Sequence, residues 1–240
     1  RENERMPTLV ALLKHYRPES CIVFCNTKVQ CQQLADELKR HSFSALALHG
    51  DLEQKDRDQV LVQFANRSCP VLIATDVAAR GLDIKDLHAV INYELSPDPE
   101  VHIHRIGRTG RADKEGLAFS LYTSAEMLRV QAIEDYIETP VTQASIDTLK
   151  PAEVETRPRQ KTDGAMVTLT ISAGRKDKIR PGDILGALTT NTGIPGTKIG
   201  KIDIFDKYAY VAVDAAVARQ AFKILSEGKI KGRKFRVTKL

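Results

Sequence analysis

The sequence predicts an α/β domain with a mostly parallel sheet and helices on both faces, followed by a small α+β domain. Two patterns predict this arrangement. In residues 1–150, short apolar runs alternate with amphipathic helical stretches, as in sheets whose strands are joined by helical crossovers. In residues 164–240, the expected elements follow the order β-α-β-β-α-β. Between them, residues 151–163 are polar, contain two prolines and show no apolar periodicity, which indicates a linker.

Five apolar runs of the first domain are expected to be strands that are buried on both faces. They are short and rich in Val, Ile, Leu and Ala, as in the strands of a parallel sheet. The runs are 21–25, 45–48, 71–74, 89–93 and 117–122.

Helices are expected between several of these strands. The stretches 28–40 and 53–65 each place their apolar residues on one side. Thr27, before the first of them, and Thr123, farther along, are each followed three residues later by Gln or Glu, the spacing of a capping box at a helix start. In folds of this kind the ligand crevice lies at the carboxyl ends of the strands.

The composition is that of an ordinary globular protein, with 42% hydrophobic and 28% charged residues. No apolar run reaches the length of a membrane span, and the start lacks the apolar core of a signal peptide. We therefore expect a cytoplasmic protein without a membrane partner.

The cysteines exclude a zinc finger. Cys21, Cys25, Cys31 and Cys69 show neither a C-x-x-C pair nor zinc-ligand spacing, so we expect them to be reduced and packed. No residue is assigned to a metal site.

The net charge of +5 is unevenly distributed. Residues 1–150 have 18 Lys and Arg against 22 Asp and Glu, a balance of −4, whereas residues 151–240 have 18 against 9, a balance of +9. Such a field on a small domain favours a polyanionic partner, and nucleic acid is the usual one. A solubilising surface charge is the alternative.

Polar residues follow three of the expected strands. Thr27 comes after the first strand, Gly50 after the second, and Thr75 with Asp76 after the third. Thr27 and Thr75 each end a strand and begin a helix, where free backbone N–H groups and a hydroxyl can hold a phosphate. A simple helix N-cap is the alternative for each threonine. Three such ends on one edge favour a shared groove for a polyanion.

A second group of polar residues follows the third strand. Arg80 and Gly81 come after a short helical stretch, with Asp83 two residues later. A guanidinium can bind a phosphate, a glycine permits a tight backbone, and a carboxylate can accept from a ribose hydroxyl. Gln54 and Arg57 lie one turn into a helix, where a solvated surface pair is the alternative to a binding role.

The segment HRIGRTGR, residues 104–111, carries the most specific pattern. Arg108 and Arg111 are three residues apart, so both are expected to point the same way from one helical turn, with Gly110 suited to the helix end. Paired guanidiniums suit a group that spreads negative charge, such as a phosphoryl group in transfer. A solvated basic turn is the alternative.

The segments CIVFCNT, HGDLEQKDR, ATDVAARGLDI and HRIGRTGR resemble, in order and spacing, motif IV, the Q-x-x-R element, motif V and motif VI of DEAD-box RNA helicases. The resemblance covers residues 1–150 and corresponds to the second of the two RecA-like domains of that family. It implies that Arg108 and Arg111 reach the γ-phosphate of ATP as arginine fingers. It also implies that Asp83 contacts the nucleotide ribose, with Gly81 beside it.

The same resemblance implies that a larger set of residues lies along the RNA backbone. These are Thr27, Gly50, Arg57, Thr75, Asp76, Arg80 and Gly81. His104 and Arg105 complete motif VI and are expected to help seat it against the other RecA-like domain.

Two motifs are missing from the chain, because it contains no G-x-x-x-x-G-K-[ST] and no Asp-Glu-Ala-Asp. The P-loop lysine, the Mg²⁺-binding carboxylate and the base that orients water are therefore expected outside it. We expect the chain to be the C-terminal part of a longer helicase that uses ATP and Mg²⁺. It would work with an N-terminal RecA-like domain of the same protein and hydrolyse no ATP by itself.

In the second domain, strands are expected over 166–171, 198–205, 208–213 and 233–238, and helices over 181–188 and 215–226. This order resembles an RNA recognition motif (RRM), a four-stranded sheet backed by two helices. Tyr208 and Tyr210 lie in a segment that resembles its RNP1 signature. Because they are two residues apart, both are expected on one sheet face, where they could stack on bases. Packing of both rings under a terminal extension or the linker is the alternative.

Basic residues at the edges of this sheet are a second candidate for RNA contact. They lie in the first loop, beside the tyrosines and around the last strand: Arg175, Lys176, Lys207, Lys229, Lys231, Arg233 and Lys234. Phosphate contact and solvated charge are both open for them.

A DEAD-box core followed by a lone C-terminal recognition motif resembles the bacterial DbpA group of this family, including the stretch KIGKIDIFDKYAYVAV. The resemblance implies action on 23S ribosomal RNA in large-subunit assembly, with the terminal domain bound to an rRNA hairpin. The alternatives are a non-enzymatic RNA-binding or annealing protein and a DNA-remodelling protein. Arg108, Arg111 and Asp83 favour the enzyme, since a scaffold has no need of groups that face a nucleotide.

Overall fold

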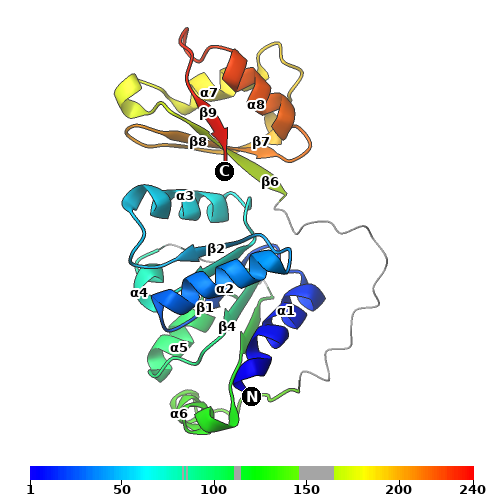
Figure 1. The fold of residues 1–240 in the computed structure, drawn as a ribbon, viewed down its shortest axis with the longest axis vertical. Helices are drawn as coiled ribbons and strands as arrows, with labels where there is room; N and C mark the ends of the chain where they lie inside the picture. The colour runs from blue at the N-terminus through cyan, green and yellow to red at the C-terminus, as the bar shows by residue number, and fades with distance from the viewer. Residues whose placement is uncertain (83, 85, 111–114, 146–164) are drawn as a thin grey trace. The chain divides into compact units, whose positions relative to one another are not determined.

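The computed structural model describes residues 1–82, 84, 86–110, 115–145 and 165–240 (Figure 1). The chain divides into two compact units, Arg1–Gln54 with Pro70–Thr162 and Lys55–Cys69 with Asp163–Leu240.

The first sheet has five strands in the order β2-β3-β1-β4-β5, and every neighbouring pair is parallel. The strands are β1 Cys21–Phe24, β2 Ala45–Leu48, β3 Val71–Ala74, β4 Ala89–Asn92 and β5 Leu117–Ser120. The predicted parallel sheet is confirmed, with β2 and β3 over the predicted residues and the other three strands one or two residues shorter.

Five α-helices accompany these strands in the described part of the chain: α1 Arg5–Tyr16, α2 Lys28–Arg40, α4 Asp76–Ala79, α5 Pro99–Ile106 and α6 Met127–Ile137. Helix α3, Gln54–Ala65, belongs from Lys55 onward to the second unit. The prediction for α2 is confirmed at both ends. The capping box before α6 is also confirmed, because the backbone N–H of Thr123 donates to Glu126 Oε2 at 2.9 Å.

Both faces of the sheet are covered. Cys21 and Val23 belong to a core shared with α1 and α2, which lie over one face (Figure 1). The alternate residues Ile22 and Phe24 face the other way and are 1% and 2% exposed. Strands buried on both faces explain why these runs are continuously apolar.

The prediction that all five strands are buried on both faces is wrong for β5. Leu117, Phe119 and Ser120 are half-buried and Ala118 is exposed. The reason is its position, because β5 is an outer strand of the sheet and pairs only with β4.

One buried histidine makes the stability of the first unit dependent on pH. His102 in α5 is 3% exposed, its Nε2 lies 3.4 Å from Ser120 Oγ, and its Nδ1 has no hydrogen-bond partner in the described residues. Burial, and then the charge of Arg105, lower the pKa of His102 from 6.5 to about 4. Between these values the unfolded chain binds a proton that the folded state excludes, so stability falls as the pH falls.

We therefore expect the free energy of unfolding to drop by roughly 2–4 kcal/mol as the pH falls from 7 to 4 through the His102 titration. Urea unfolding at several pH values measures this loss. A His102→Gln variant is expected to show a smaller loss over the same range, and an identical loss would contradict the assignment.

The second sheet has four strands in the order β7-β8-β6-β9, and all its pairs are antiparallel. The strands are β6 Met166–Ile171, β7 Ile199–Ile204, β8 Ala209–Asp214 and β9 Val237–Lys239, and the helices are α7 Pro181–Thr189 and α8 Ala218–Glu227. Both helices lie on the same side of this sheet (Figure 1). The predicted order β-α-β-β-α-β is confirmed.

The last strand is shorter than predicted, because residues 233–236 do not pair with β6. Lys231 and Gly232 adopt positive φ angles of 51° and 79°, and Ile230 pairs with Arg233 in a tight turn. The chain therefore reaches the sheet only at Val237. Gly228 ends α8, as the sequence indicated.

Candidate functional site

The carboxyl ends of three adjacent strands form one edge of the first sheet. The backbone N–H of Thr75 donates to the carbonyl of Leu48 at 3.4 Å, and that of Cys25 to the carbonyl of Ala74 at 3.2 Å. The residues that follow β1, β2 and β3 are thereby brought side by side. We call this edge the strand-end rim and define it by Thr27, Gly50 and Thr75.

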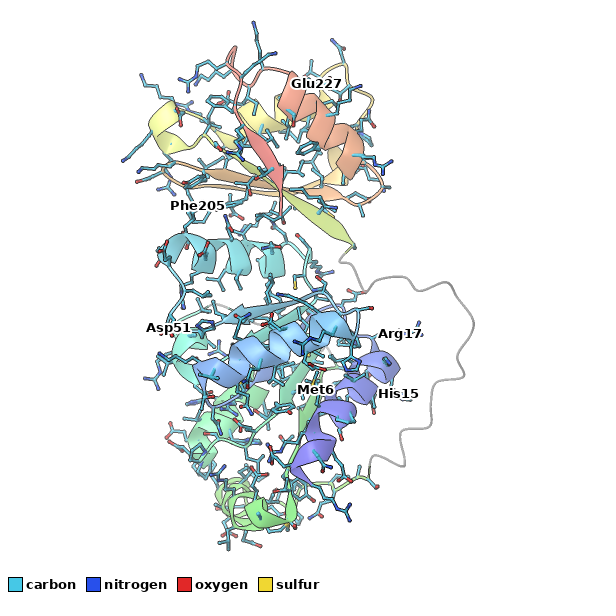
Figure 2. All side chains as sticks on the ribbon, viewed as in Figure 1. Met6, His15, Arg17, Asp51, Phe205 and Glu227 are labelled. Carbon is cyan, nitrogen blue, oxygen red and sulfur yellow. The ribbon has the colours of Figure 1, made fainter. Side chains whose placement is uncertain are left out.

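Each rim residue has a distinct local setting. Thr27 is the N-cap of α2, and its Oγ1 accepts from the N–H of Gln30 at 3.2 Å. Thr75 precedes α4, is 9% exposed and makes no side-chain cap bond. Gly50 is exposed. Asp51, labelled in Figure 2, lies beside Gly50 and forms an ion pair of 2.9 Å with Lys28 of α2.

The predicted capping box at α2 is half formed. Thr27 makes its bond, but Gln30 Oε1 is buried without a hydrogen-bond partner in the described residues. The N-cap alternative for Thr27 is therefore present in the structure. It leaves the other free N–H groups of the first turn of α2 available at the rim.

A turn follows α4, in which the backbone N–H of Leu82 donates to the Ala79 carbonyl at 3.3 Å. Arg80 is exposed and ends α4 with φ −63° and ψ 136°. Gly81 has φ +75°, a left-handed conformation that side chains disfavour. Asp83 lies outside the described residues. Arg57 lies in α3, one turn after Gln54.

The prediction that Arg108 stands on a helical turn is wrong. Helix α5 ends at Ile106 with Gly107 as its C-cap, so Arg108 follows the helix. The chain turns there because Thr109 pairs with Leu87 through a β-bridge and its hydroxyl donates to the Leu87 carbonyl. Gly110 then adopts φ +67° outside the helix. Arg111 lies outside the described residues.

The guanidinium of Arg108 lies against the backbone that flanks Asp83. Its Nη1 donates to the carbonyl of Leu82 at 3.0 Å and to that of Ile84 at 3.4 Å. No carboxylate of the described residues pairs with it. These two carbonyls fix the direction of the guanidinium.

Gly116 supports this segment and was not predicted from the sequence. A Cβ atom at Gly116 would lie 2.1 Å from Thr109 Oγ1 and 2.3 Å from the backbone nitrogen of Gly110. The next chain segment therefore packs directly on motif VI, and only glycine fits there.

We expect Gly116→Ala to lower the free energy of unfolding by about 1–3 kcal/mol, because backbone atoms must move to admit the methyl group. Urea unfolding of the variant and of the unmodified chain measures this change in the free energy of unfolding. Gly50→Ala is the matched control, since no atom lies within 4 Å of a Cβ there. Equal stability of the two variants would show that the clash is relieved at no cost.

Arg105 does not seat motif VI against another domain, contrary to the prediction. It is 2% exposed, and its Nε and Nη2 donate to the two carboxylate oxygens of Asp76 at 2.7 and 2.6 Å. His104, next to it, is exposed. The carboxylate of Asp76 is thus held by an internal partner.

In the second unit, β6 and β8 direct alternate residues to opposite sides. Leu169 and Val211 belong to the core shared with α7 and α8, whereas Thr170 and Tyr210 pair across the two strands on the other face. Tyr210 is 1% exposed and meets Phe205 edge to face at 5.4 Å. Phe205 is labelled in Figure 2.

Tyr208 precedes β8 and is half-buried. Tyr208 and Tyr210 both interact with α3, since Lys55 Nζ lies 4.9 Å from the centroid of the Tyr208 ring and Gln59 hydrogen-bonds to Tyr210. Base stacking by either ring stays a prediction.

The basic residues predicted at the edges of this unit are exposed. They are Arg175, Lys176, Lys207, Lys229, Lys231, Arg233 and Lys234. Some are held by neighbours, since Lys231 Nζ donates to the Lys178 carbonyl at 2.9 Å and Arg233 Nη2 to Asp177 Oδ1 at 2.8 Å. The Gly174 N–H and Arg233 lower the pKa of Asp177. This edge is therefore an ordered basic surface.

Sequence reasoning missed Asn26 and Asn92 as partners of Arg105. Both accept from its guanidinium, at 3.1 and 3.2 Å. A signal was present, because each amide stands at the end of an apolar strand run, where a polar side chain needs a partner.

The described residues contain no helix long and apolar enough to cross a membrane. They also contain no group of three or more His, Cys, Asp or Glu side chains that could hold a metal ion.

Comparisons with known proteins agree with this geometry. A family model described as the helicase conserved C-terminal domain matches residues 4–113, and one described as the DbpA RNA binding domain matches residues 168–239. The chain is 51% identical over 239 residues to the ATP-dependent RNA helicase DbpA of Escherichia coli K12, covering 97% of this chain and 50% of that protein. It is 35% identical to DbpA of Bacillus subtilis 168, covering 100% of this chain and 53% of that protein. The chain thus spans about half the length of these curated relatives.

Solved structures give the same result. The E. coli DEAD-box protein SrmB, bound to regulator of ribonuclease activity A, matches with a TM-score of 0.59 and 33% identity, covering 67% of this chain and 92% of that one. Dbp5 L327V of S. cerevisiae, bound to RNA and ADP BeF3, matches with a TM-score of 0.55 and 33% identity, covering 62% of this chain and 41% of that one.

Proposed function

Because this chain belongs to the DEAD-box RNA helicases, in their DbpA group, we propose that it is the C-terminal part of an ATP-dependent helicase that acts on 23S rRNA. In this proposal the first unit supplies half of the ATP and RNA sites, and the second anchors the enzyme to an rRNA hairpin. The protein then works in the cytoplasm during assembly of the large ribosomal subunit.

The observation that carries the enzymatic part is the position of Arg108. Its guanidinium is oriented by the Leu82 and Ile84 carbonyls and has no carboxylate partner in the described residues. A cation held in this way can neutralise the charge that develops on a phosphoryl group during transfer. Gly81 and Asp83 would contact the nucleotide, and Arg111 would be the second finger.

The strand-end rim supports the RNA part. Backbone N–H groups at the start of α2 and α4, with the hydroxyls of Thr27 and Thr75, suit successive phosphates of a single strand. Gly50, Asp76 and Arg80 complete the proposed track of this unit, and Arg57 of α3 stays a predicted RNA contact. Contacts of this kind read the backbone and carry no sequence information.

The second unit would supply the specificity that such a rim lacks. Its exposed basic residues suit the phosphates of a folded RNA. Binding one hairpin raises the effective concentration of nearby duplex at the core. Because the sequence contains no P-loop and no Asp-Glu-Ala-Asp motif, the proposal places the Mg²⁺ ligands on the N-terminal RecA-like domain.

We expect the purified chain to bind a 23S rRNA hairpin and to show no RNA-stimulated ATP hydrolysis above background. The P-loop and DEAD motifs that would hold the phosphates and Mg²⁺ are absent from its sequence. Joined to a P-loop and DEAD domain, it is expected to restore RNA-stimulated hydrolysis. A phosphate-release assay and fluorescence anisotropy measure the two activities.

ATP turnover by the chain alone would contradict the division of the site between two domains. RNA binding by the chain, with no hydrolysis in the joined protein, would favour the non-enzymatic annealing function. Equal affinity for DNA of the same sequence would favour a DNA-remodelling function.

A further inference from the structure

Arg105 is a fully buried cation whose hydrogen bonds are all made. Nε and Nη2 donate to the two oxygens of Asp76, Nη2 also to Asn26 Oδ1 at 3.1 Å, and Nη1 to Asn92 Oδ1 at 3.2 Å and the Glu94 carbonyl at 2.8 Å. A guanidinium has five N–H groups, and here each has its own acceptor. The guanidinium also lies over the ring of Phe24, 5.1 Å from its centroid.

Two of the three side-chain acceptors belong to segments that carry the strand-end rim. Asn26 immediately precedes Thr27, and Asp76 immediately follows Thr75. Asn26 is itself fixed, since its N–H donates to Glu94 Oε2 at 2.8 Å and its Nδ2 to the Leu95 carbonyl at 3.2 Å. A shift of either rim threonine therefore changes the bonds of Arg105.

The backbone of Arg105 is attached to Arg108. The N–H of Arg108 donates to the Arg105 carbonyl at 3.2 Å, in the turn that follows α5. Arg105 thus bonds by its side chain to Asn26 and Asp76, the sequence neighbours of two rim residues, and by its carbonyl to the proposed arginine finger.

Stability alone gives a weak reason for such a residue. Replacing a buried ion pair with apolar side chains of the same volume is often neutral or stabilising, because burial of the charges offsets their attraction. The distinctive property of this pair is that its hydrogen bonds fix the relative orientation of the groups that they join. Five bonds in a rigid fork define one orientation of α5 relative to the ends of β1, β3 and β4.

We propose that Arg105 is a positioning residue that couples RNA at the strand-end rim to the placement of Arg108 toward ATP. This inference rests on the proposed function for its enzymatic readout, but the coupling is a property of the chain itself. When RNA binds and orders Thr27 and Thr75, it also orders their neighbours Asn26 and Asp76. Because both are bonded to Arg105, the turn that carries Arg108 becomes ordered as well.

The first test uses hydrogen exchange in the chain alone, with and without single-stranded RNA. RNA is expected to slow amide exchange at 26–28 and 75–77, where it binds, and at 107–109, where it does not. In Arg105→Lys, which keeps the charge and loses the fork, protection at the rim is expected to remain and protection at 107–109 to disappear. RNA-dependent protection at 107–109 that is unchanged in Arg105→Lys would overturn the proposal.

The second test measures kcat, KM for ATP and RNA affinity in the chain joined to its P-loop and DEAD domain. Arg105→Lys is expected to lower RNA stimulation of kcat at least about tenfold, with RNA affinity within about threefold of the unmodified protein. Unchanged stimulation in Arg105→Lys would refute the coupling.

Arg5→Lys is the matched control. Arg5 is a second buried arginine of the same unit, 5% exposed, that donates to the Tyr93 carbonyl at 2.7 Å and pairs with Glu126. It has no bond to the rim. Loss of thermal stability without loss of RNA stimulation is expected for Arg5→Lys, and equal loss of stimulation in both arginine variants would assign Arg105 a purely structural role.

The two proposals fail separately. If the joined protein shows no RNA-stimulated ATPase, but amide exchange at 107–109 still depends on RNA and on Arg105, the enzymatic function is refuted and the coupling is kept. If the joined protein has normal RNA-stimulated ATPase and Arg105→Lys does not change that stimulation, the function is kept and the coupling is refuted.

Discussion

Arg108→Ala, in the chain joined to a P-loop and DEAD domain, is expected to lower kcat for RNA-stimulated ATP hydrolysis by about 10³-fold or more. The guanidinium is held by the Leu82 and Ile84 carbonyls and has no internal carboxylate among the described residues. Its charge is therefore available to a transition state, and its removal leaves the developing charge uncompensated. Steady-state phosphate release at saturating RNA and ATP measures the loss.

The Arg108 effect is expected in kcat, with RNA affinity preserved. The backbone N–H that bonds to Arg105 remains in the alanine variant, so the turn after α5 keeps its anchor. Arg129→Ala is a suitable control, because Arg129 is 45% exposed on α6 and pairs only weakly, at 3.6 Å, with Glu126. A loss of less than about tenfold for Arg108→Ala would remove the arginine-finger assignment.

Replacement of Lys231, Arg233 and Lys234 by Gln is expected to weaken rRNA-hairpin binding roughly 100-fold, from three lost contacts of about 1 kcal/mol each. All three side chains are exposed next to a turn ordered by two positive φ angles. Phosphate contacts release counterions, so the slope of log affinity against log salt should also decrease by about 3. Fluorescence anisotropy across a salt series measures both quantities.

A triple Gln variant at Lys14, Lys39 and Arg40 is the control for the basic edge. It removes the same charge from exposed positions of the first unit and is expected to leave hairpin affinity within about threefold. Tyr210→Ala tests the sheet face separately. If that change leaves affinity intact while the basic triple variant loses it, base stacking by Tyr210 is excluded and the edges bind the RNA.

Coupling through Arg105 gives the first unit a physical route between its two proposed ligands. The RNA track and the arginine finger lie on separate segments, and the fork of Arg105 joins them in one network of short bonds. An ATPase that is active only on RNA requires such a connection between sites.

Elements with strong local patterns could be predicted closely from the sequence. Helix α2 was correct at both ends because Thr27 caps it and its apolar side is continuous. β2 and β3 were correct because apolar runs between polar ends permit few other structures. The sequence-based predictions were wrong where pairing with a segment distant in sequence decides the local conformation. Arg108 left the predicted helical turn because Thr109 pairs with Leu87, and β9 shortened because only residues 237–239 meet β6.

By itself, the sequence determined the parallel sheet, the recognition-motif-like second unit and the residue types at the strand ends, since these follow from periodicity and short motifs. Only the tertiary structure decided what Arg105 does. Its partners Asp76 and Asn26 lie 29 and 79 residues away, and they meet it because the register of β1, β3 and β4 aligns three strand ends against α5. A buried side chain takes its role from such long-range neighbours, which no local pattern contains.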